Sequence, residues 1–122
     1  MKKLICFLIF AANIISAKAQ SSCQEIMEYV KSENSGTTYI NYTSTAINKV
    51  TFYDITIDYK YYYFAIVCFK QEYSYTCSEY IYQVDSNTKF NYSLHYLESA
   101  GEAFWKFIHP YNKNLNCAPT FE

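Results

Sequence analysis

The spacing of apolar residues predicts a helix that begins at Ser22. Ser22 and Glu25, three residues apart, form the capping-box pattern of a helix N-terminus. The apolar residues that follow share one helical face, and they are Cys23, Ile26, Met27 and Val30. Turn-forming residues 33–36 come next, so we expect the helix to end near Ser32.

Runs of β-branched and aromatic residues then predict a sheet. The runs cover residues 37–42, 50–57, 61–70 and 75–84. Residues 61–70 (YYYFAIVCFK) are apolar at odd and even positions alike, so this strand is expected to lie centrally, with both faces covered. Turn-like residues separate the runs at positions 58–60, 71–74 and 85–87.

The segment over residues 88–97 is ambiguous. Its apolar residues alternate with polar ones, at Phe90, Tyr92, Leu94 and Tyr96. The alternation favours a strand, although the segment is long enough for a helix. A second capping box, Ser99 with Glu102, predicts a C-terminal helix that Pro110 closes. The apolar stripe of that helix is Phe104, Phe107, Ile108 and Tyr111.

Together these elements predict one small α+β domain over residues 20–122. We expect an antiparallel meander of four to five strands, an N-terminal helix and a C-terminal helix packed on one sheet face. Neither an internal repeat nor a linker divides this stretch, whose length is typical of one domain and not two.

Residues 1–19 have the three parts of a secretory signal peptide. Lys2 and Lys3 form the basic start, an apolar run covers residues 4–15, and Ala17 and Ala19 form an Ala-x-Ala cleavage site. The apolar run is shorter than the roughly 20 residues that a spanning helix needs, so we expect no membrane anchor after cleavage. The pattern is typical of an exported bacterial protein, secreted or periplasmic.

Cleavage would leave an acidic domain without arginine. The whole chain has 10 Lys+Arg and 11 Asp+Glu. Removing Lys2, Lys3 and Lys18 leaves 7 against 11, a net charge of −4, and every remaining basic residue is a lysine. Nucleic-acid binding draws its affinity from a basic field, so no nucleic-acid partner is expected.

Cysteine content predicts two disulfides. Cys6 lies in the signal peptide, which leaves Cys23, Cys68, Cys77 and Cys117. Four cysteines in an exported chain allow three connectivities. A two-residue loop at Glu72 and Tyr73 would place Cys68 opposite Cys77, which favours that bridge and leaves Cys23 to pair with Cys117. The pair Glu-Tyr is poor chemistry for so tight a loop, so the other connectivities stay open.

Three stretches resemble the KTSC domain family. They are the run STAI followed by VTFYD in residues 44–54, the motif Tyr80-Ile81-Tyr82 with Val84, and SAGEAF at the start of residues 99–111. The family occurs as small single bacterial domains and as an appendage to some lysyl-tRNA synthetases, and RNA binding has been suggested for it. The resemblance therefore implies nucleic-acid binding, which the acidic charge and the predicted export disfavour.

No constellation of residues predicts catalysis. The two histidines, His95 and His109, stand in no metal-binding spacing, so neither a metal nor a cofactor is expected. A small secreted hydrolase remains an alternative, with an acid/base pair of carboxylates. The available carboxylates are Asp54, Asp58, Glu79, Glu98 and Glu102.

Tyrosine content is the one unusual feature of composition, with 15 tyrosines in 122 residues. If the C-terminal helix covers one sheet face, tyrosines on the opposite face would form an amphipathic binding platform. The candidate binding residues are Tyr61, Tyr63, Tyr80 and Tyr82. The alternative explanation of the tyrosines is core packing, cross-strand aromatic pairs and the base composition of the coding sequence, and exposed aromatic residues alone are weak evidence against it.

The sequence thus predicts an exported, non-catalytic binding module that uses a tyrosine-rich sheet face. Its partner would be a protein, as for an inhibitor or an immunity-type factor, or a glycan of the cell envelope.

Overall fold

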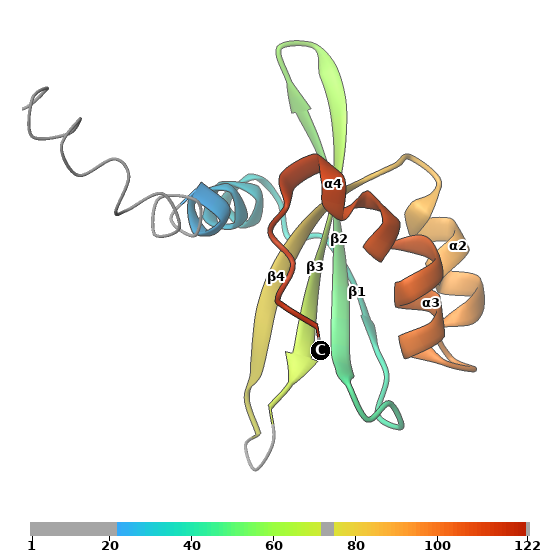
Figure 1. Ribbon diagram of the computed structural model, residues 1–122. Coiled ribbons are helices and arrows are strands. Elements are labelled where there is room, and N and C mark those ends of the chain that lie inside the picture. The colour runs from blue at the N-terminus through green and yellow to red at the C-terminus, as the bar shows by residue number, and fades with distance from the viewer. Residues whose placement is uncertain (1–21, 72–74, 122) are drawn as a thin grey trace, which may run out of the picture.

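The computed structural model describes residues 22–71 and 75–121, which form one antiparallel sheet with helices on both faces (Figure 1). Residues 22–33 are helical. The strands follow as β1 (Thr37–Ile40), β2 (Ile47–Ile57), β3 (Lys60–Lys70) and β4 (Cys77–Val84). The C-terminal part contains α2 (Thr88–His95), α3 (Ala100–Phe107), a 3-10 turn (His109–Tyr111) and α4 (Asn112–Leu115). The predicted α+β architecture is confirmed.

The sheet is a meander in which sequence neighbours pair, in the order β1-β2-β3-β4. Its longest pairing is the β2–β3 hairpin, in which Ile57 pairs with Lys60 across a two-residue turn. Asp58 and Tyr59 form that turn with φ angles of 51° and 68°. Positive φ at both central residues matches a type I′ turn, whose twist suits a tight hairpin. The outer part of this hairpin projects beyond the rest of the sheet (Figure 1).

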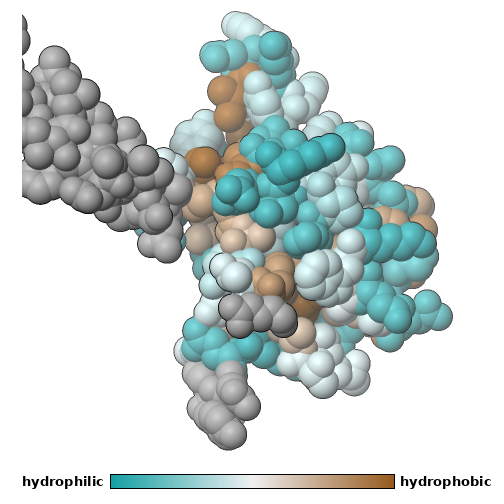
Figure 2. Space-filling model, in the orientation of Figure 1, coloured by the Kyte–Doolittle hydropathy of each residue, from teal (hydrophilic) through white to brown (hydrophobic). Residues whose placement is uncertain are grey.

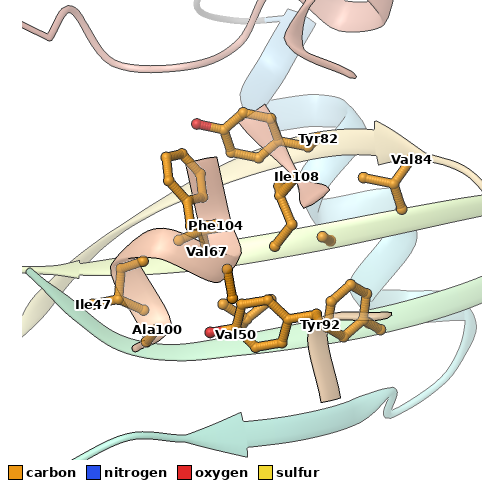
Figure 3. Close-up of a cluster of buried hydrophobic side chains, with 12 residues drawn as sticks. Ile47, Val50, Val67, Tyr82, Val84, Tyr92, Ala100, Phe104 and Ile108 are labelled. Carbon is orange, nitrogen blue, oxygen red and sulfur yellow. The ribbon is translucent and has the colours of Figure 1, made fainter. Parts of the chain in front are cut away.

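One face of the sheet, here named the helix-pair face, packs against α2 and α3. Its buried cluster includes Ala65 and Val67 of β3, Tyr82 of β4 and Phe104 of α3 (Figure 3). Phe104 and Ile108 are almost fully buried, which contributes roughly 1.5–3 kcal/mol for each side chain. The capping box is confirmed, because the Ser99 hydroxyl accepts a hydrogen bond of 3.1 Å from the Glu102 backbone N–H.

The opposite face, here named the single-helix face, packs against the helix of residues 22–33. Met27 and Val30 of this helix lie against Phe64 and Ile66 of β3. Five consecutive residues of β3, 64–68, are buried, so the prediction that this strand lies centrally is confirmed. Each face of the sheet thus has its own apolar core.

Residues 88–97, whose alternation favoured a strand, contain helix α2 instead. Tyr92 is buried and stacks on Tyr96, one helical turn away, with ring centroids 5.5 Å apart. Three other apolar side chains of this segment are exposed, namely Phe90, Leu94 and Leu97. Two of them, Phe90 and Leu94, alternate with Tyr92 and Tyr96 and so created an apparent period of two. The buried positions decide the structure, and they follow the helical period.

Both disulfides have the expected partners, Cys23 with Cys117 and Cys68 with Cys77. The register behind the second expectation is wrong, because Cys77 lies opposite Lys70 and Cys68 lies opposite Glu79. Cys68 and Cys77 are therefore diagonal neighbours on one face, with Cα atoms 5.3 Å apart. Residues 71–76 connect the strands, and the expected two-residue loop at positions 72–73 falls outside the described residues.

The segment after α4 crosses the outer edge of β4. Cys117 belongs to the core of the single-helix face, whereas the next residue, Ala118, packs on the core of the helix-pair face. The Asn114 side-chain amide also donates a hydrogen bond of 2.8 Å to the Gln83 carbonyl on that edge. This crossing covers an edge strand that would otherwise be open to pairing with another chain.

We expect the two disulfides to contribute unequally to stability. The bridge Cys23–Cys117 closes a separation of 94 residues and Cys68–Cys77 one of 9. Loop entropy then predicts losses of about 4–5 kcal/mol for Cys23→Ser with Cys117→Ser and about 2–3 kcal/mol for Cys68→Ser with Cys77→Ser. Urea titration of both double variants measures this difference. Equal losses would contradict the loop-entropy explanation.

Candidate functional site

The four candidate tyrosines do not form an exposed platform. Tyr61, Tyr63, Tyr80 and Tyr82 share the helix-pair face, which α2 and α3 cover. Tyr82 is 0% exposed, and Tyr63 and Tyr80 pack partly buried against the same core. Only Tyr61, at 71% exposure, reaches solvent freely, because it lies on the projecting part of the hairpin.

Burial explains Tyr63, Tyr80 and Tyr82 as residues in or against the core. The Tyr82 ring packs edge-on against Phe104, with centroids 5.6 Å apart (Figure 3). Its hydroxyl is buried and has no hydrogen-bond partner among the described residues. A period of two placed these tyrosines on one face correctly, but periodicity does not reveal which face the C-terminal helices cover.

The candidate carboxylates are dispersed. Glu79 pairs with Lys31 at 2.5 Å, and Asp54 lies 4.0 Å from Lys89. Asp58 is at the hairpin turn. Glu98 and Glu102 line one cavity, but its volume of about 110 Å³ is well below the roughly 300 Å³ of a small ligand pocket. The described residues therefore provide no carboxylate pair in a cavity of substrate size.

Each of the two histidines makes contacts within the fold that account for its position. The His95 Nδ1 lies 2.9 Å from the Asn91 carbonyl oxygen, one helical turn earlier. His109 packs against the rings of Trp105 and Phe121, at centroid distances of 4.5 and 5.6 Å, and these two rings also contact each other. Within residues 22–71 and 75–121, no three His, Cys, Asp or Glu side chains gather in a way that would hold a metal ion.

An apolar groove lies on the single-helix face where the hairpin leaves the body of the domain. It has a volume of about 380 Å³. Ile26, Tyr29 and Val30 of the first helix form one wall, and Ile57, Tyr62 and Phe64 of the hairpin form the floor. Leu115 of α4, Glu25 and Gln83 complete the lining. Apolar residues at the base of the hairpin, beside the first helix, are visible in Figure 2.

Two exposed tyrosines lie in or near this groove: Tyr29 is part of its lining, and Tyr59 is two residues beyond Ile57 of its floor. Tyr29 is 45% exposed on the first helix, and Tyr59 is 99% exposed at the tip of the hairpin. Tyr59 also has φ of 68°, a left-handed conformation that costs a side-chain-bearing residue roughly 1–2 kcal/mol. Glycine is the residue that a type I′ turn favours at this position. A strained, fully exposed aromatic residue therefore stands at the most accessible point of the hairpin.

The rim of the groove is acidic. Interaction of the Tyr29 hydroxyl with the Glu33 carboxylate raises the pKa of this tyrosine, and burial and the charges of Glu33 and Asp58 raise it further. Glu33 lies one helical turn beyond Tyr29, and Asp58 follows Ile57 of the groove floor. Glu25 contributes a third carboxylate from the groove wall.

A larger cavity of about 540 Å³ lies between the start of the first helix, β4 and the C-terminal segment. Its lining mixes polar and apolar residues, and the Cys23–Cys117 disulfide forms part of it. We assign the candidate site to the smaller groove, because its lining is almost wholly apolar and includes the exposed Tyr29.

The groove could not be located from the sequence. The turn at residues 58–60 and the concentration of tyrosines around it were both visible in the chain. The groove itself arises only because the first helix lies across the single-helix face and leaves the outer part of that face uncovered.

Comparisons with family models, with curated proteins and with solved structures found no match for this chain. The resemblance to the KTSC family therefore stays a prediction. In the structure, the motif Tyr80-Ile81-Tyr82 with Val84 lies in β4, where Ile81, Tyr82 and Val84 are buried. Ser99 caps α3.

The predicted extracellular or periplasmic location has indirect support. Two disulfides are typical of proteins that fold in an oxidising environment, which is compatible with an extracellular or periplasmic location. Among the described residues, no helix is long and apolar enough to cross a membrane. The predicted signal peptide, residues 1–19, lies outside the described residues.

We expect alkaline pH to destabilise the protein through two buried tyrosines. Burial raises the pKa of Tyr82 and of Tyr92 above the usual value of 10.0, with smaller contributions from Tyr80 and Tyr96. Above pH 10 the unfolded chain ionises while the folded chain does not, so stability present below pH 10 is lost as pH rises.

The variant Tyr82→Phe tests this assignment. It removes an unpaired buried hydroxyl, so we expect a gain of about 1 kcal/mol below pH 10 and a shallower decline above it. Urea titrations between neutral pH and pH 11 measure both effects. A loss of stability at neutral pH would contradict the unpaired state of this hydroxyl.

Substitution of the strained tyrosine should stabilise the fold. Tyr59→Gly relieves the left-handed strain, for a net gain of about 0.5–1 kcal/mol after the extra entropy of glycine in the unfolded chain. Tyr59→Ser removes the ring but keeps the strain, so it should give no such gain. Urea unfolding of both variants provides the measurement, and equal stabilities would contradict the strain argument.

Proposed function

We propose that this chain is an exported, non-catalytic binding module that docks a protein partner at the β2–β3 hairpin. Export would use residues 1–19 as a cleaved signal peptide, and the disulfides would form in the periplasm or outside the cell. The observation that carries the proposal is the open apolar groove, whose lining includes the exposed Tyr29 and whose floor residue Ile57 is followed by the hairpin tip with the exposed Tyr59.

The chemistry of the groove favours a protein segment over a glycan. Sugar sites combine an aromatic face with several convergent hydrogen-bonding groups. Here Glu25 and Gln83 are the polar residues in a lining that is otherwise apolar or aromatic. Apolar side chains of a partner would bury against such a lining, and tyrosines supply contact area at low entropic cost.

The acidic residues near the groove indicate which charge its partner carries. Glu25 lines the groove, Glu33 lies one helical turn beyond Tyr29, and Asp58 follows Ile57 of the floor. These three carboxylates outweigh Lys60, which pairs with Ile57, so a segment with lysine or arginine beside its apolar anchors is complementary. The partner we propose is therefore a basic, apolar-anchored protein segment. The tyrosines that the sequence singled out lie on the opposite, helix-pair face. Tyr61 is exposed on the hairpin there, and Tyr63, Tyr80 and Tyr82 pack in or against the core of that face.

Site-specific photocrosslinking in the host envelope tests the proposal. With the photoreactive residue p-benzoylphenylalanine in place of Tyr59, we expect irradiation to give a defined adduct with another protein. The matched control places the same residue at Tyr42, which is 86% exposed and belongs neither to the hairpin nor to the groove.

A supporting result also depends on the groove. Adding Tyr62→Ser should reduce the adduct at position 59 at least about tenfold, because loss of a buried aromatic anchor typically costs 2 kcal/mol or more. The Trp105 fluorescence and the urea midpoint report whether this variant stays folded. Equal adducts at positions 59 and 42, or an adduct that Tyr62→Ser leaves unchanged in a folded chain, would contradict docking at this site.

A further inference from the structure

We infer that the groove receives an amphipathic α-helix of the partner, which lies alongside the first helix on the single-helix face. This inference rests on the proposed function and specifies the partner's conformation and charge. Three observations support it: the unequal cover of the two sheet faces, the shape of the groove, and the capped backbone at the sheet edges.

The two faces of the sheet have unequal helical cover. Two helices, α2 and α3, pack on the helix-pair face. On the single-helix face, the helix of residues 22–33 packs on the sheet, and the short α4 adds only Leu115 to the edge of that core. Strands β2 and β3 have 11 residues each, or about 37 Å at 3.4 Å per residue. One helix is about 10 Å wide, so much of the length of these strands extends beyond it.

The shape of the groove suits a helix. Its wall is the side of the first helix that carries Ile26, Tyr29 and Val30, and its floor includes Ile57 and Tyr62 of the neighbouring strands. A second helix resting on that floor would pack against the first one, as helices on a sheet commonly do. Apolar residues of the incoming helix at i, i+3, i+4 and i+7 would face both surfaces.

An extended segment is less suited, because side chains cap the sheet edges near the groove. The Asn34 side-chain amide donates a hydrogen bond of 2.8 Å to the Asp54 carbonyl on the outer edge of β2. At the opposite edge of the sheet, on β4, the Asn114 side-chain amide donates a hydrogen bond of 2.8 Å to the Gln83 carbonyl. Strand addition needs these carbonyls, whereas a helix satisfies its own backbone and needs only the apolar surface.

Charge predicts the polar residues of the incoming helix. Glu25, Tyr29 and Glu33 follow one another at intervals of four on the first helix, so carboxylates stand at both ends of the exposed wall. Asp58, next to Ile57 of the floor, adds a third carboxylate, and Lys60, which pairs with Ile57, adds one positive charge. Lysine or arginine residues along the flank of the incoming helix would pair with this acidic rim.

The test is selection of a displayed library of random peptides, about 15 residues or four helical turns long, on the oxidised protein. We expect peptides with apolar residues at helical spacing and a positive charge, which become helical on binding as measured by circular dichroism. Tyr62→Ser and Tyr29→Ser should weaken binding about tenfold each, and Tyr42→Ser should leave it unchanged.

Charge variants test the second half of the inference. Glu25→Gln and Glu33→Gln should each slow association about threefold to tenfold at low salt, with less effect at high salt. Glu98→Gln, between α2 and α3, is the matched control. Identical rates for all three variants would overturn the assignment of a basic partner.

The outcomes separate this inference from the proposed function. Groove-dependent peptides that bind in an extended or proline-rich form would overturn the helix and leave docking at the groove intact. A library that yields no peptide sensitive to Tyr62→Ser overturns the helical occupant, while the crosslink at position 59 independently decides whether a protein docks there. Oligomers formed through Tyr59 and Tyr62 would identify a second copy as the occupant and overturn the inference.

Discussion

Pairing between β2 and β3 determines where the other elements of the domain lie. The two strands pair from Ile47–Phe69 to Ile57–Lys60, and their side chains alternate between the two cores. The helix-pair face receives α2 and α3, and the single-helix face receives the first helix. Gly36 lets the chain pass from that helix to β1, because a Cβ there would lie 2.8 Å from the Phe52 carbonyl. The hairpin is therefore both the scaffold of the domain and, at its far end, a highly exposed surface.

The sequence predicted the features that depend on neighbouring residues. The Ser99 cap, the central strand and the turn at residues 58–60 each follow from local chemistry, and the structure confirms them. Features that depend on tertiary packing were not predictable. The exposed Phe90 and Leu94 gave residues 88–97 the alternation of a strand. Whether the face that carries Tyr82 is buried depends on α3, which packs on that face. The disulfide partners were correct although the register was not, because a diagonal pair of cysteines is also close enough to bridge.

The candidate site combines local strain with apolar exposure. Tyr59 occupies a backbone conformation that glycine adopts without cost, and its ring contributes nothing to either core. Such a residue is costly to stability in isolation, which is the usual relation between a binding residue and the fold that presents it. The scaffold tolerates this cost, because the strands on either side of the turn are long and well paired.

The Cys23–Cys117 disulfide also constrains the order in which the protein is assembled. Its partners are 94 residues apart, so the first helix is not covalently fixed until Cys117 has been synthesised and brought to it. Until then, the sheet would have to form without this covalent closure. Formation of this bond therefore requires that the first helix and the C-terminal segment have both reached their positions, so the bond marks a chain in which both are in place.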